Sequence, residues 1–195
     1  MRRKHHAVRI IGGKHRGRRL AAPEGLRVRP TSDRAREALF DILAHGRFGE
    51  RPVYEEARVL DAFAGTGAFG LEALSRGADH ASFIEKDRAA LAALRANIAA
   101  LGEEKRAAVL PGDAGAPPPA GQPVTLAFLD PPYGQGLAPA ALAALAARGW
   151  LAPGALVVVE AAAREKLEPP AEFTLLQERR YGAARLVFLR YRAAA

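Results

Sequence analysis

Residues 59–70 read Val-Leu-Asp-Ala-Phe-Ala-Gly-Thr-Gly-Ala-Phe-Gly, an apolar run that leads into a glycine-rich turn and then into a helical pattern. A strand, a G-x-G-x-x-G turn and a helix in this order are typical of the first βαβ unit of a nucleotide-binding α/β fold. Glu85 lies 20 residues after Gly65, where such folds place an acid that binds ribose hydroxyls. The stretch therefore predicts a doubly wound parallel sheet with a cofactor bound at this turn.

Short apolar runs alternate with helical periodicity after this stretch. Strand, helix and strand at such spacing favour a parallel α/β sheet whose ligands bind at the carboxyl ends of the strands. Beyond Glu160 the rhythm changes, and two runs around a glycine predict an antiparallel hairpin at the sheet edge, over 172–177 and 185–192. The expected strands are 58–62, 81–85, 107–110, 124–129 and 155–160, the expected helices are 33–44, 68–76, 87–101 and 138–148, and 112–123 is expected to be a loop.

Two cofactors could use the glycine turn. A nicotinamide dinucleotide fits the glycine spacing and Glu85. Asp61, however, has no role toward a pyrophosphate and would lie near its negative charge. S-adenosylmethionine has no phosphate, and its sulfonium and ammonium groups are favoured by a carboxylate at this place. The residues favour S-adenosylmethionine, with a dehydrogenase as the competing hypothesis.

The residues of the expected cofactor site follow from this choice. Glycine allows the backbone to approach the cofactor, and Glu85 can accept from both ribose hydroxyls. Asp113, after the third apolar run, could accept from the adenine amino group, although an Asp after Gly112 is also a common turn former. Glu85 could likewise only cap the following helix. The expected cofactor-binding residues are Asp61, Phe63, Gly65, Gly67, Glu85, Lys86, Asp113, Ala114 and Asp130.

A second motif, Asp130-Pro131-Pro132-Tyr133, directly follows the apolar run 124–129. Two prolines remove two backbone donors and prevent a regular strand or helix from continuing, so nearby carbonyls stay free to accept. The Tyr133 ring can stack on a planar base while the Asp130 carboxylate and the Pro131 carbonyl accept the hydrogens of an exocyclic amine. A simple turn is the alternative, but its position beside the glycine turn favours a ligand site. We expect an amino-methyltransferase with Asp130, Pro131 and Tyr133 as catalytic residues.

Positive charge is concentrated near the N-terminus. Residues 1–36 hold twelve Lys and Arg against two acidic residues, a net charge of +10, whereas the whole chain carries +8. A basic segment on a near-neutral body is typical of a nucleic-acid binder, although a solvated tail is the simpler alternative. Residues 7–11 and 18–22 flank a glycine-rich turn and predict a basic β-hairpin. The expected RNA-binding residues are Arg9, Lys14, Arg16, Arg18 and Arg19.

The composition also excludes several classes of protein. The chain has no cysteine and five scattered histidines, so disulfides and thiolate metal sites are excluded and no metal is expected. No apolar run approaches the ~18 residues of a membrane span, and the charged start lacks the apolar segment of a secretion signal. We expect no membrane association and a cytoplasmic location.

With these motifs, the chain resembles the RsmD family of bacterial 16S ribosomal RNA guanine-N2 methyltransferases over essentially its whole length. Two of the matching segments, the glycine turn and the Asp-Pro-Pro-Tyr motif, are shared by many amino-methyltransferases. The other two are more specific, Arg9-Ile10-Ile11-Gly12-Gly13 with Arg16-Gly17-Arg18, and Arg29-Pro30-Thr31-Ser32-Asp33-Arg34-Ala35-Arg36-Glu37-Ala38-Leu39-Phe40.

The resemblance implies a Rossmann-like, S-adenosylmethionine-dependent α/β fold, with a seven-stranded, mostly parallel sheet, helices on both faces and an N-terminal β-hairpin arm. It implies a basic RNA-binding extension over 1–29 and a methyltransferase domain over 30–195. It also suggests that Thr31 lines the methionine end of the cofactor site. The implied substrate is the N2 amine of a guanine in 16S ribosomal RNA, within the small subunit or an assembly particle, and we expect a monomer.

Two further hypotheses remain beside the dehydrogenase. A DNA adenine-N6 methyltransferase would use the same amine-binding logic, but it needs a region that reads base edges, and few residues remain after the sheet. A non-catalytic RNA-binding assembly factor would keep the fold without the chemistry. Such a binder would not require Asp61, Glu85, Asp130 and Tyr133 together.

Overall fold

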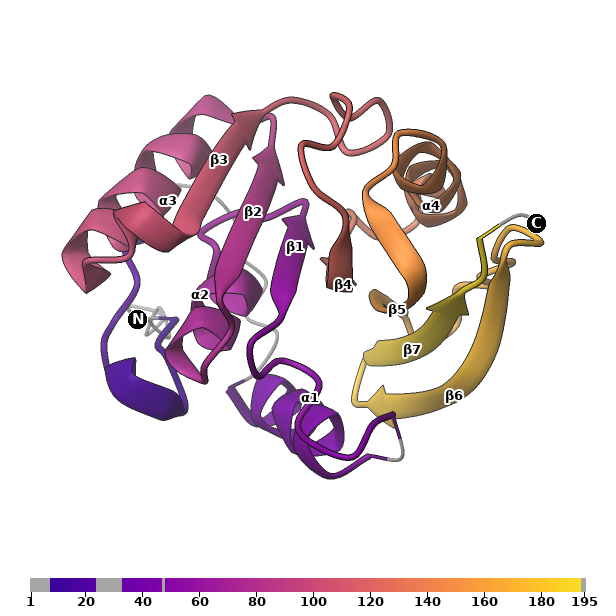
Figure 1. The fold of residues 1–195 in the computed structure, drawn as a ribbon, viewed down its shortest axis with the longest axis horizontal. Helices are drawn as coiled ribbons and strands as arrows, with labels where there is room; N and C mark the ends of the chain where they lie inside the picture. The colour runs from indigo at the N-terminus through magenta and orange to yellow at the C-terminus, as the bar shows by residue number, and fades with distance from the viewer. Residues whose placement is uncertain (1–7, 24–32, 47, 194–195) are drawn as a thin grey trace, which may run out of the picture.

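A computed structural model of the chain describes residues 8–23, 33–46 and 48–193. Within these ranges seven strands form one sheet in the order β3-β2-β1-β4-β5-β7-β6 (Figure 1). The strands from β3 to β5 are parallel, and β7 runs antiparallel to both β5 and β6. The predicted seven-stranded, mostly parallel sheet with an antiparallel edge hairpin is confirmed. The strands are β1 (Arg58–Ala62), β2 (His80–Glu85), β3 (Ala107–Pro111), β4 (Val124–Leu129), β5 (Leu151–Ala162), β6 (Phe173–Tyr181) and β7 (Ala184–Tyr191).

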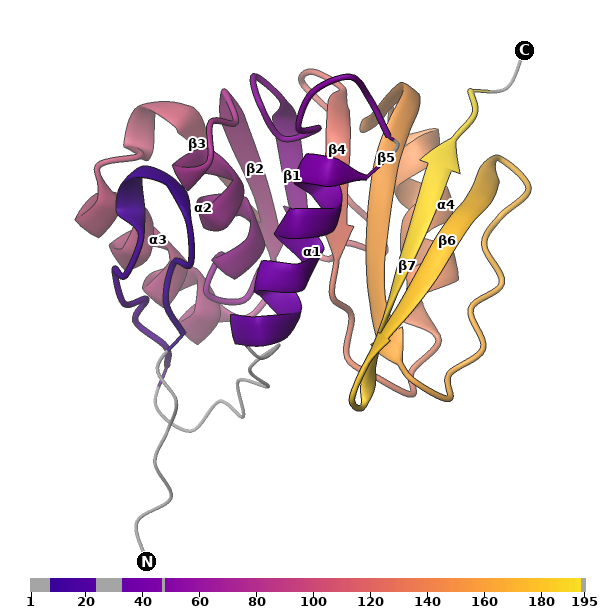
Figure 2. The ribbon, with the colours of Figure 1, turned by 90° about the horizontal axis from the view of Figure 1, so that it is seen from below.

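Helices cover both faces of the sheet (Figure 2). Leu126 and Phe128 of β4 belong to the hydrophobic cluster that contains residues of α1, α2 and α3, whereas Ala127 and Leu129 belong to the cluster of α4. Successive side chains of a strand point to opposite faces, so an uninterrupted apolar run is buried on both. Within the described ranges no helix has the length and apolar character that a membrane crossing requires. The helices are α1 (Asp33–His45), α2 (Ala68–Ser75), α3 (Arg88–Leu101) and α4 (Leu137–Ala147), with short 3-10 helices η1 (Gly13–His15) and η2 (Glu104–Arg106).

The strand order changes direction between β1 and β4. From β1 the chain moves outward to β2 and β3, and it then returns to place β4 on the other side of β1. The last residues of the two neighbours are paired, Ala62 with Leu129. Ligand crevices of doubly wound sheets form where the connections diverge in this way. The fold therefore brings the glycine turn after β1 and the Asp130 motif after β4 to one point.

Two strands near the C-terminus are longer than the sequence pattern predicts. Strand β5 covers Leu151–Ala162 instead of 155–160, and it includes a register shift against β4 between Val124 and Leu126. Strand β6 continues to Tyr181 instead of ending at 177. Arg179 and Arg180 near its end are exposed, as charged residues of an edge strand often are, and they conceal the strand pattern. Only two residues, 182 and 183, separate β6 from β7.

The N-terminal segment, residues 8–23, forms an irregular hairpin. One antiparallel bridge joins Arg9 to Arg19, and the Ile10 and Leu20 amides donate to carbonyls on the opposite side of the hairpin. Residue 7 lies outside the described residues, and the rest of the predicted strands 7–11 and 18–22 form a single bridge instead of regular strands. The amides of Ile11 and Gly12 bind the body of the protein. Each of these two amides donates to the Glu72 carboxylate of α2 at 2.7 Å.

This segment is docked on the sheet domain and shares its core. Val8, Ile10 and Leu20 are buried in the cluster that contains α1, α2 and α3. Ser75 accepts from the His15 amide at 2.9 Å and donates to the Gly12 carbonyl at 2.6 Å. The expected boundary between residues 29 and 30 lies outside the described residues.

Two glycines of this segment give a matched test of its docking. Gly13 has φ +71°, and a Cβ there would lie 1.8 Å from the Ser75 carbonyl oxygen, whereas Gly17 has φ +84° and open space around it. Gly17→Ala should cost roughly 1 kcal/mol of unfolding free energy from backbone strain alone. Gly13→Ala should cost about 1–3 kcal/mol more, because the segment must move away from α2. Urea denaturation and the rate of tryptic cleavage within 8–23 check this, and equal values for both variants would contradict the docking.

Candidate active site

A cavity of about 360 Å³ opens at the carboxyl ends of β1 to β4. Its volume lies in the usual range for small-molecule and cofactor sites. The lining mixes apolar side chains with several carboxylates. The cavity brings together seven of the predicted site residues, Phe63, Gly65, Glu85, Lys86, Asp113, Ala114 and Asp130.

The wall of this cavity is formed by the turn between β1 and α2. Phe63 has φ 63°, Gly65 has φ 55° and Gly67 has φ 82°, so three residues of the turn have left-handed backbone. Such a conformation is strained for Phe63, and strained residues gather at functional sites. Gly65 lines the cavity, and a Cβ added there would meet no atom within 4 Å. Glycine at this position leaves room for a ligand to approach the backbone.

The other two glycines of the motif are needed for packing. A Cβ at Gly67 would lie 2.4 Å from Leu94 Cδ1 of α3, and one at Gly70 would lie 2.3 Å from the Phe83 ring of β2. Neither glycine is among the cavity-lining residues. Gly67, which the sequence predicts as a cofactor-binding residue, lies outside the lining and lets α2 start close to α3 and β2.

Asp61 lies beneath the turn and does not line the cavity. Its side chain is buried, and Oδ2 accepts from the Gly70 amide at 2.9 Å near the start of α2. Burial raises the pKa of Asp61 to about 7, the Gly70 amide opposes this rise, and the nearby charge of Glu85 adds to it. The carboxylate joins the end of β1 to the N-terminus of α2.

Glu85 is fixed at the cavity by three backbone amides. Its Oε2 accepts from Gly65 at 2.8 Å, and its Oε1 accepts from Lys86 and Asp87, each at 2.8 Å. The helix cap is a different residue, because Asp87 accepts from the Ala90 amide at 2.8 Å. Glu85 therefore holds the loop after β2 against the glycine turn, and its carboxylate remains part of the cavity wall.

Asp113 and Lys86 form an ion pair at the cavity edge, with Nζ and Oδ2 2.9 Å apart. The hydrogen bond from Lys86 lowers the pKa of Asp113, as does the Gly115 amide, which donates to Oδ1 at 2.8 Å. The same pair raises the pKa of Lys86. The bond to Gly115 is that of a turn-forming Asp, so Asp113 shapes the loop after β3 as well as lining the cavity.

The Asp-Pro-Pro-Tyr motif extends from the cavity to β5. Asp130 and Pro132 line the cavity, and Pro131 is buried between them. Tyr133 is half-buried, and its hydroxyl donates to Glu160 Oε1 at 2.7 Å. Glu160 is only 5% exposed and lies at the carboxyl end of β5, the strand next to β4. This contact fixes the orientation of the Tyr133 ring.

Several residues of this region were not expected from the sequence. Glu160 holds Tyr133, Asp87 caps α3, and Gln135 and Leu137 line the cavity after the motif. Glu160 could have been found from the sequence, because it is a carboxylate at the end of the apolar run of β5. Thr31, expected at the methionine end of the site, lies outside the described residues.

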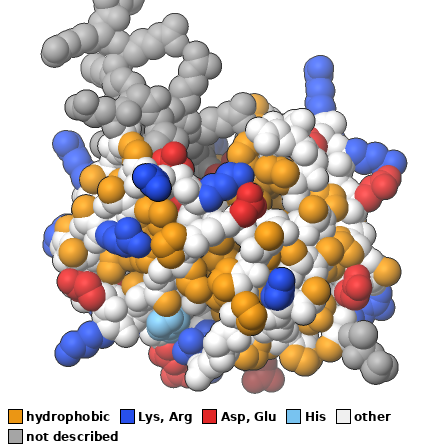
Figure 3. Space-filling model, turned by 90° about the horizontal axis from the view of Figure 1, so that it is seen from above, with side chains coloured by type: hydrophobic (Ala, Val, Ile, Leu, Met, Phe, Trp, Pro, Cys, Tyr) orange, Lys and Arg blue, Asp and Glu red, His pale blue; other side chains and the backbone are white. Residues whose placement is uncertain are grey.

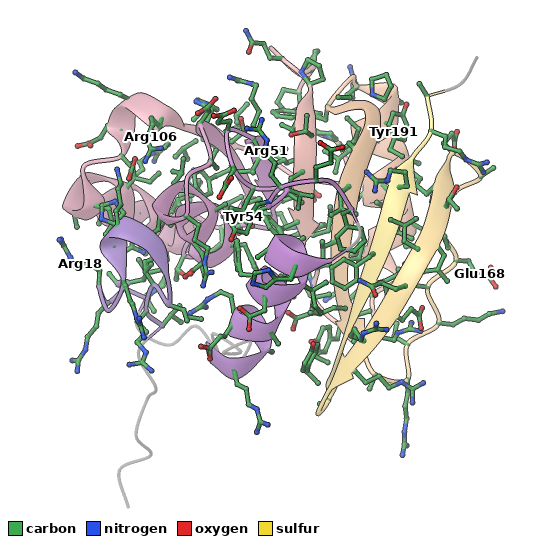
Figure 4. All side chains as sticks on the ribbon, turned by 60° about the horizontal axis from the view of Figure 1, so that its bottom comes forward. Arg18, Arg51, Tyr54, Arg106, Glu168 and Tyr191 are labelled. Atoms are coloured by element: carbon green, nitrogen blue, oxygen red, sulfur yellow. The ribbon has the colours of Figure 1, made fainter. Side chains whose placement is uncertain are left out.

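The predicted RNA-binding residues lie on the docked segment, on the β3 side of the sheet (Figure 4). Lys14 pairs with Glu103 at 2.7 Å, and Arg18 donates to the Ala100 carbonyl at 2.6 Å. Arg9, Arg16 and Arg19 are exposed. On the side of the molecule opposite that of Figure 2, basic and acidic side chains are interspersed with hydrophobic ones (Figure 3).

The cavity fits S-adenosylmethionine better than a dinucleotide. Glu85, Asp87, Asp113 and Asp130 supply four carboxyl groups, and Lys86 is the one cation among the described lining residues. Carboxylates suit ribose hydroxyls, an amino group and a sulfonium, whereas a pyrophosphate would be repelled.

Comparison with known proteins identifies the family. The family model described as Conserved hypothetical protein 95 matches residues 8–190. The chain belongs to this family. Ribosomal RNA small subunit methyltransferase D of Escherichia coli K12 is 42% identical over 173 residues, which cover 88% of this chain and 84% of that protein. The protein of the same name from Haemophilus influenzae is 36% identical over 179 residues, covering 90% and 89%.

Solved structures agree with this family. A putative methyltransferase, yhhF, from Escherichia coli superimposes with a TM-score of 0.81 at 41% identity, covering 96% of this chain and 99% of that one. A putative methylase from Haemophilus influenzae gives 0.76 at 33% identity, covering 95% and 99%. This member of the Conserved hypothetical protein 95 family is a methyltransferase with a Rossmann-like fold, which confirms the predicted enzyme class.

The buried Asp61 predicts a specific pH dependence of stability. Its folded pKa of about 7 lies above the ordinary value of 3.8, so the folded state binds more protons between these values. The contribution of protonated Asp61 to the unfolding free energy is present at low pH and is lost as the pH rises toward 7. Asp61→Asn keeps an acceptor for Gly70 and does not titrate. Without cofactor, the unfolding free energy of the wild type should fall relative to that of Asp61→Asn between about pH 4 and pH 7; parallel pH profiles would contradict the raised pKa.

Proposed function

We propose that the chain transfers a methyl group from S-adenosylmethionine to the exocyclic N2 amine of a guanine in 16S ribosomal RNA. The observation that carries this proposal is the Asp130 motif, which begins in a carboxylate-rich cavity and ends on a ring held by Glu160. The names of the relatives, ribosomal RNA small subunit methyltransferase D, support the substrate. Neither a DNA adenine methyltransferase nor a non-catalytic factor finds support among them.

The cofactor would occupy the cavity between the ends of β1 and β4. S-adenosylmethionine supplies the methyl group when it is bound. Glu85 would accept from the ribose hydroxyls, Asp113 would accept from the adenine amino group, and the turn at Gly65 would contact the cofactor through its backbone. Asp61 would act through the turn that it supports, since it lies beneath the lining. The proposed site further includes Phe63, Gly67, Lys86, Ala114 and Thr31.

The chain's own groups would prepare the amine for reaction. The nitrogen lone pair must leave conjugation with the guanine ring before it can attack. Hydrogen bonds from the amine to the Asp130 carboxylate and the Pro131 carbonyl would favour this change and stabilise the developing positive charge. Tyr133 would stack on the base, and its hydroxyl bond to Glu160 keeps the ring in one plane. Asp130 would accept the proton after transfer, when the alkylated amine is strongly acidic.

The proposed partner is the small ribosomal subunit or an assembly particle, bound by the chain as a monomer in the cytoplasm. The basic segment would contact RNA through Arg9, Lys14, Arg16, Arg18 and Arg19. Its high local charge supports this role. The contacts of Lys14 and Arg18 with α3 and its following turn show that these two side chains also help to dock the segment.

Asp130→Ala should separate catalysis from cofactor binding. We expect turnover to fall at least about 100-fold, because the amine loses its acceptor, while the Kd for S-adenosylmethionine changes little. Asp79→Ala, which removes an exposed carboxylate before β2, is the matched control and should behave as the wild type. Calorimetric titration and single-turnover kinetics check this; equal loss of binding and turnover in Asp130→Ala would show that Asp130 mainly holds the cofactor.

The identity of the product tests the reaction itself. Unmethylated small-subunit RNA, free or in particles, should receive label at N2 of one guanine when incubated with the enzyme and labelled S-adenosylmethionine. Mass mapping of the labelled nucleotide checks the position. Label in adenine of DNA, with none in the ribosomal RNA, would overturn the proposal in favour of the DNA enzyme.

A further inference from the structure

The turn between β6 and β7 lies at the same sheet edge as the catalytic motif. Ala184 of β7 pairs with Tyr181 of β6 and with Ala162, the last residue of β5. The β6–β7 turn therefore lies beside the carboxyl end of β5. The β4 strand beside β5 ends at the same edge, where Asp130 follows it. Figure 2 shows the β6–β7 turn at the lower edge of the sheet.

Hydrogen bonds connect this hairpin to the catalytic loop. We call residues 163–166 and 178–185 the hairpin platform. The Ala163 amide donates to the Ala183 carbonyl at 2.9 Å, and Arg185 donates to the Glu165 carbonyl. The Glu165 carboxylate in turn accepts from the Gly134 amide, directly after Tyr133, at 3.4 Å. The platform is therefore a fixed neighbour of the residues proposed to hold the target base.

The platform presents arginines whose charge is not neutralised within the described structure. Arg164 and Arg180 are exposed, and their side chains make no hydrogen bond or ion pair with any described residue. The nearby acid Glu178 is already paired with Arg185 at 3.1 Å. Arg180 also lies directly opposite Arg185 in the β6–β7 register, and like charges in such a pair destabilise a sheet. Glu178 already offsets the charge of Arg185, and a bound anion would neutralise that of Arg180.

The described part of the basic segment, residues 8–23, lies away from the platform. Its turn contacts Ser75, the last residue of α2, and Glu103, just after the end of α3, and it lies on the β3 side of the sheet. Both helices start at the edge that carries the cavity and end at the opposite one. An RNA strand that reaches Asp130 from the β6 side would therefore meet the platform first.

We propose that the hairpin platform binds phosphates of the RNA strand next to the target nucleotide, through Arg164 and Arg180. This inference rests on the proposed function, because it assigns the RNA contact to the proposed catalytic edge. Guanidinium groups suit phosphate contacts, which position a substrate without reading its sequence. The platform would thus hold the strand while the base turns toward Tyr133.

The test compares two double charge reversals. Arg164→Glu/Arg180→Glu changes the platform, and Arg51→Glu/Arg148→Glu changes two exposed cations at the opposite edge, before β1 and β5 and away from the basic N-terminal segment. Filter binding of an unmodified 16S ribosomal RNA transcript is measured across a salt series, together with the Kd for S-adenosylmethionine. We expect the platform variant to bind RNA at least about tenfold more weakly, with a salt slope reduced by about two, and to bind cofactor as the wild type does.

The opposite-edge variant should retain wild-type affinity and salt slope. Equal RNA binding by the two variants, or a uniform loss in both, would overturn the inference. Methylation of guanine by the wild type is followed in the same samples. A wild type that binds RNA without methylating guanine would count against the proposed function, while the comparison of the two variants still decides whether the platform binds RNA.

Discussion

One buried hydrogen bond, from the Gly70 amide to the Asp61 carboxylate, supports the whole site. It joins the end of β1 to the first turn of α2, so the connecting loop has little freedom. The loop can follow this path because Gly67 and Gly70 allow α2 to lie against Leu94 and Phe83. The position of the cavity wall is thus set by packing below it rather than by contacts within the cavity.

The electrostatics of the site follow from the same arrangement. Parallel strands end in carboxylates at one edge, and the Glu85 charge contributes to the raised pKa of Asp61. Backbone amides and Lys86 offset part of this negative charge at Glu85 and Asp113. The negative charge that is not offset favours a ligand with positive charge. A sulfonium cofactor and an amine that becomes cationic during reaction both suit such an environment, whereas a phosphate would not.

The sequence predicted those features that depend on residues close together in the chain. The apolar run of β4, the glycine turn and Glu85 reveal a parallel sheet because each has a local pattern. The Tyr133–Glu160 contact was not predictable, since it requires β5 to lie beside β4. The role of Glu72 was hidden as well, because an acid within a helix usually faces solvent. Edge strand β6 was cut short in the prediction because Glu178, Arg179 and Arg180 interrupt its apolar pattern.

The attachment of residues 8–23 to Glu72 determines how that segment can be studied. A shortened protein without it would leave a fully buried carboxylate with two of its hydrogen-bond donors missing and would expose the surface that Val8, Ile10 and Leu20 cover. Such a protein would lose stability as well as positive charge, so weak RNA binding by it could not be assigned to either cause. The backbone of the segment belongs to the folding unit, whereas the exposed guanidinium groups of Arg16 and Arg19 can be removed independently.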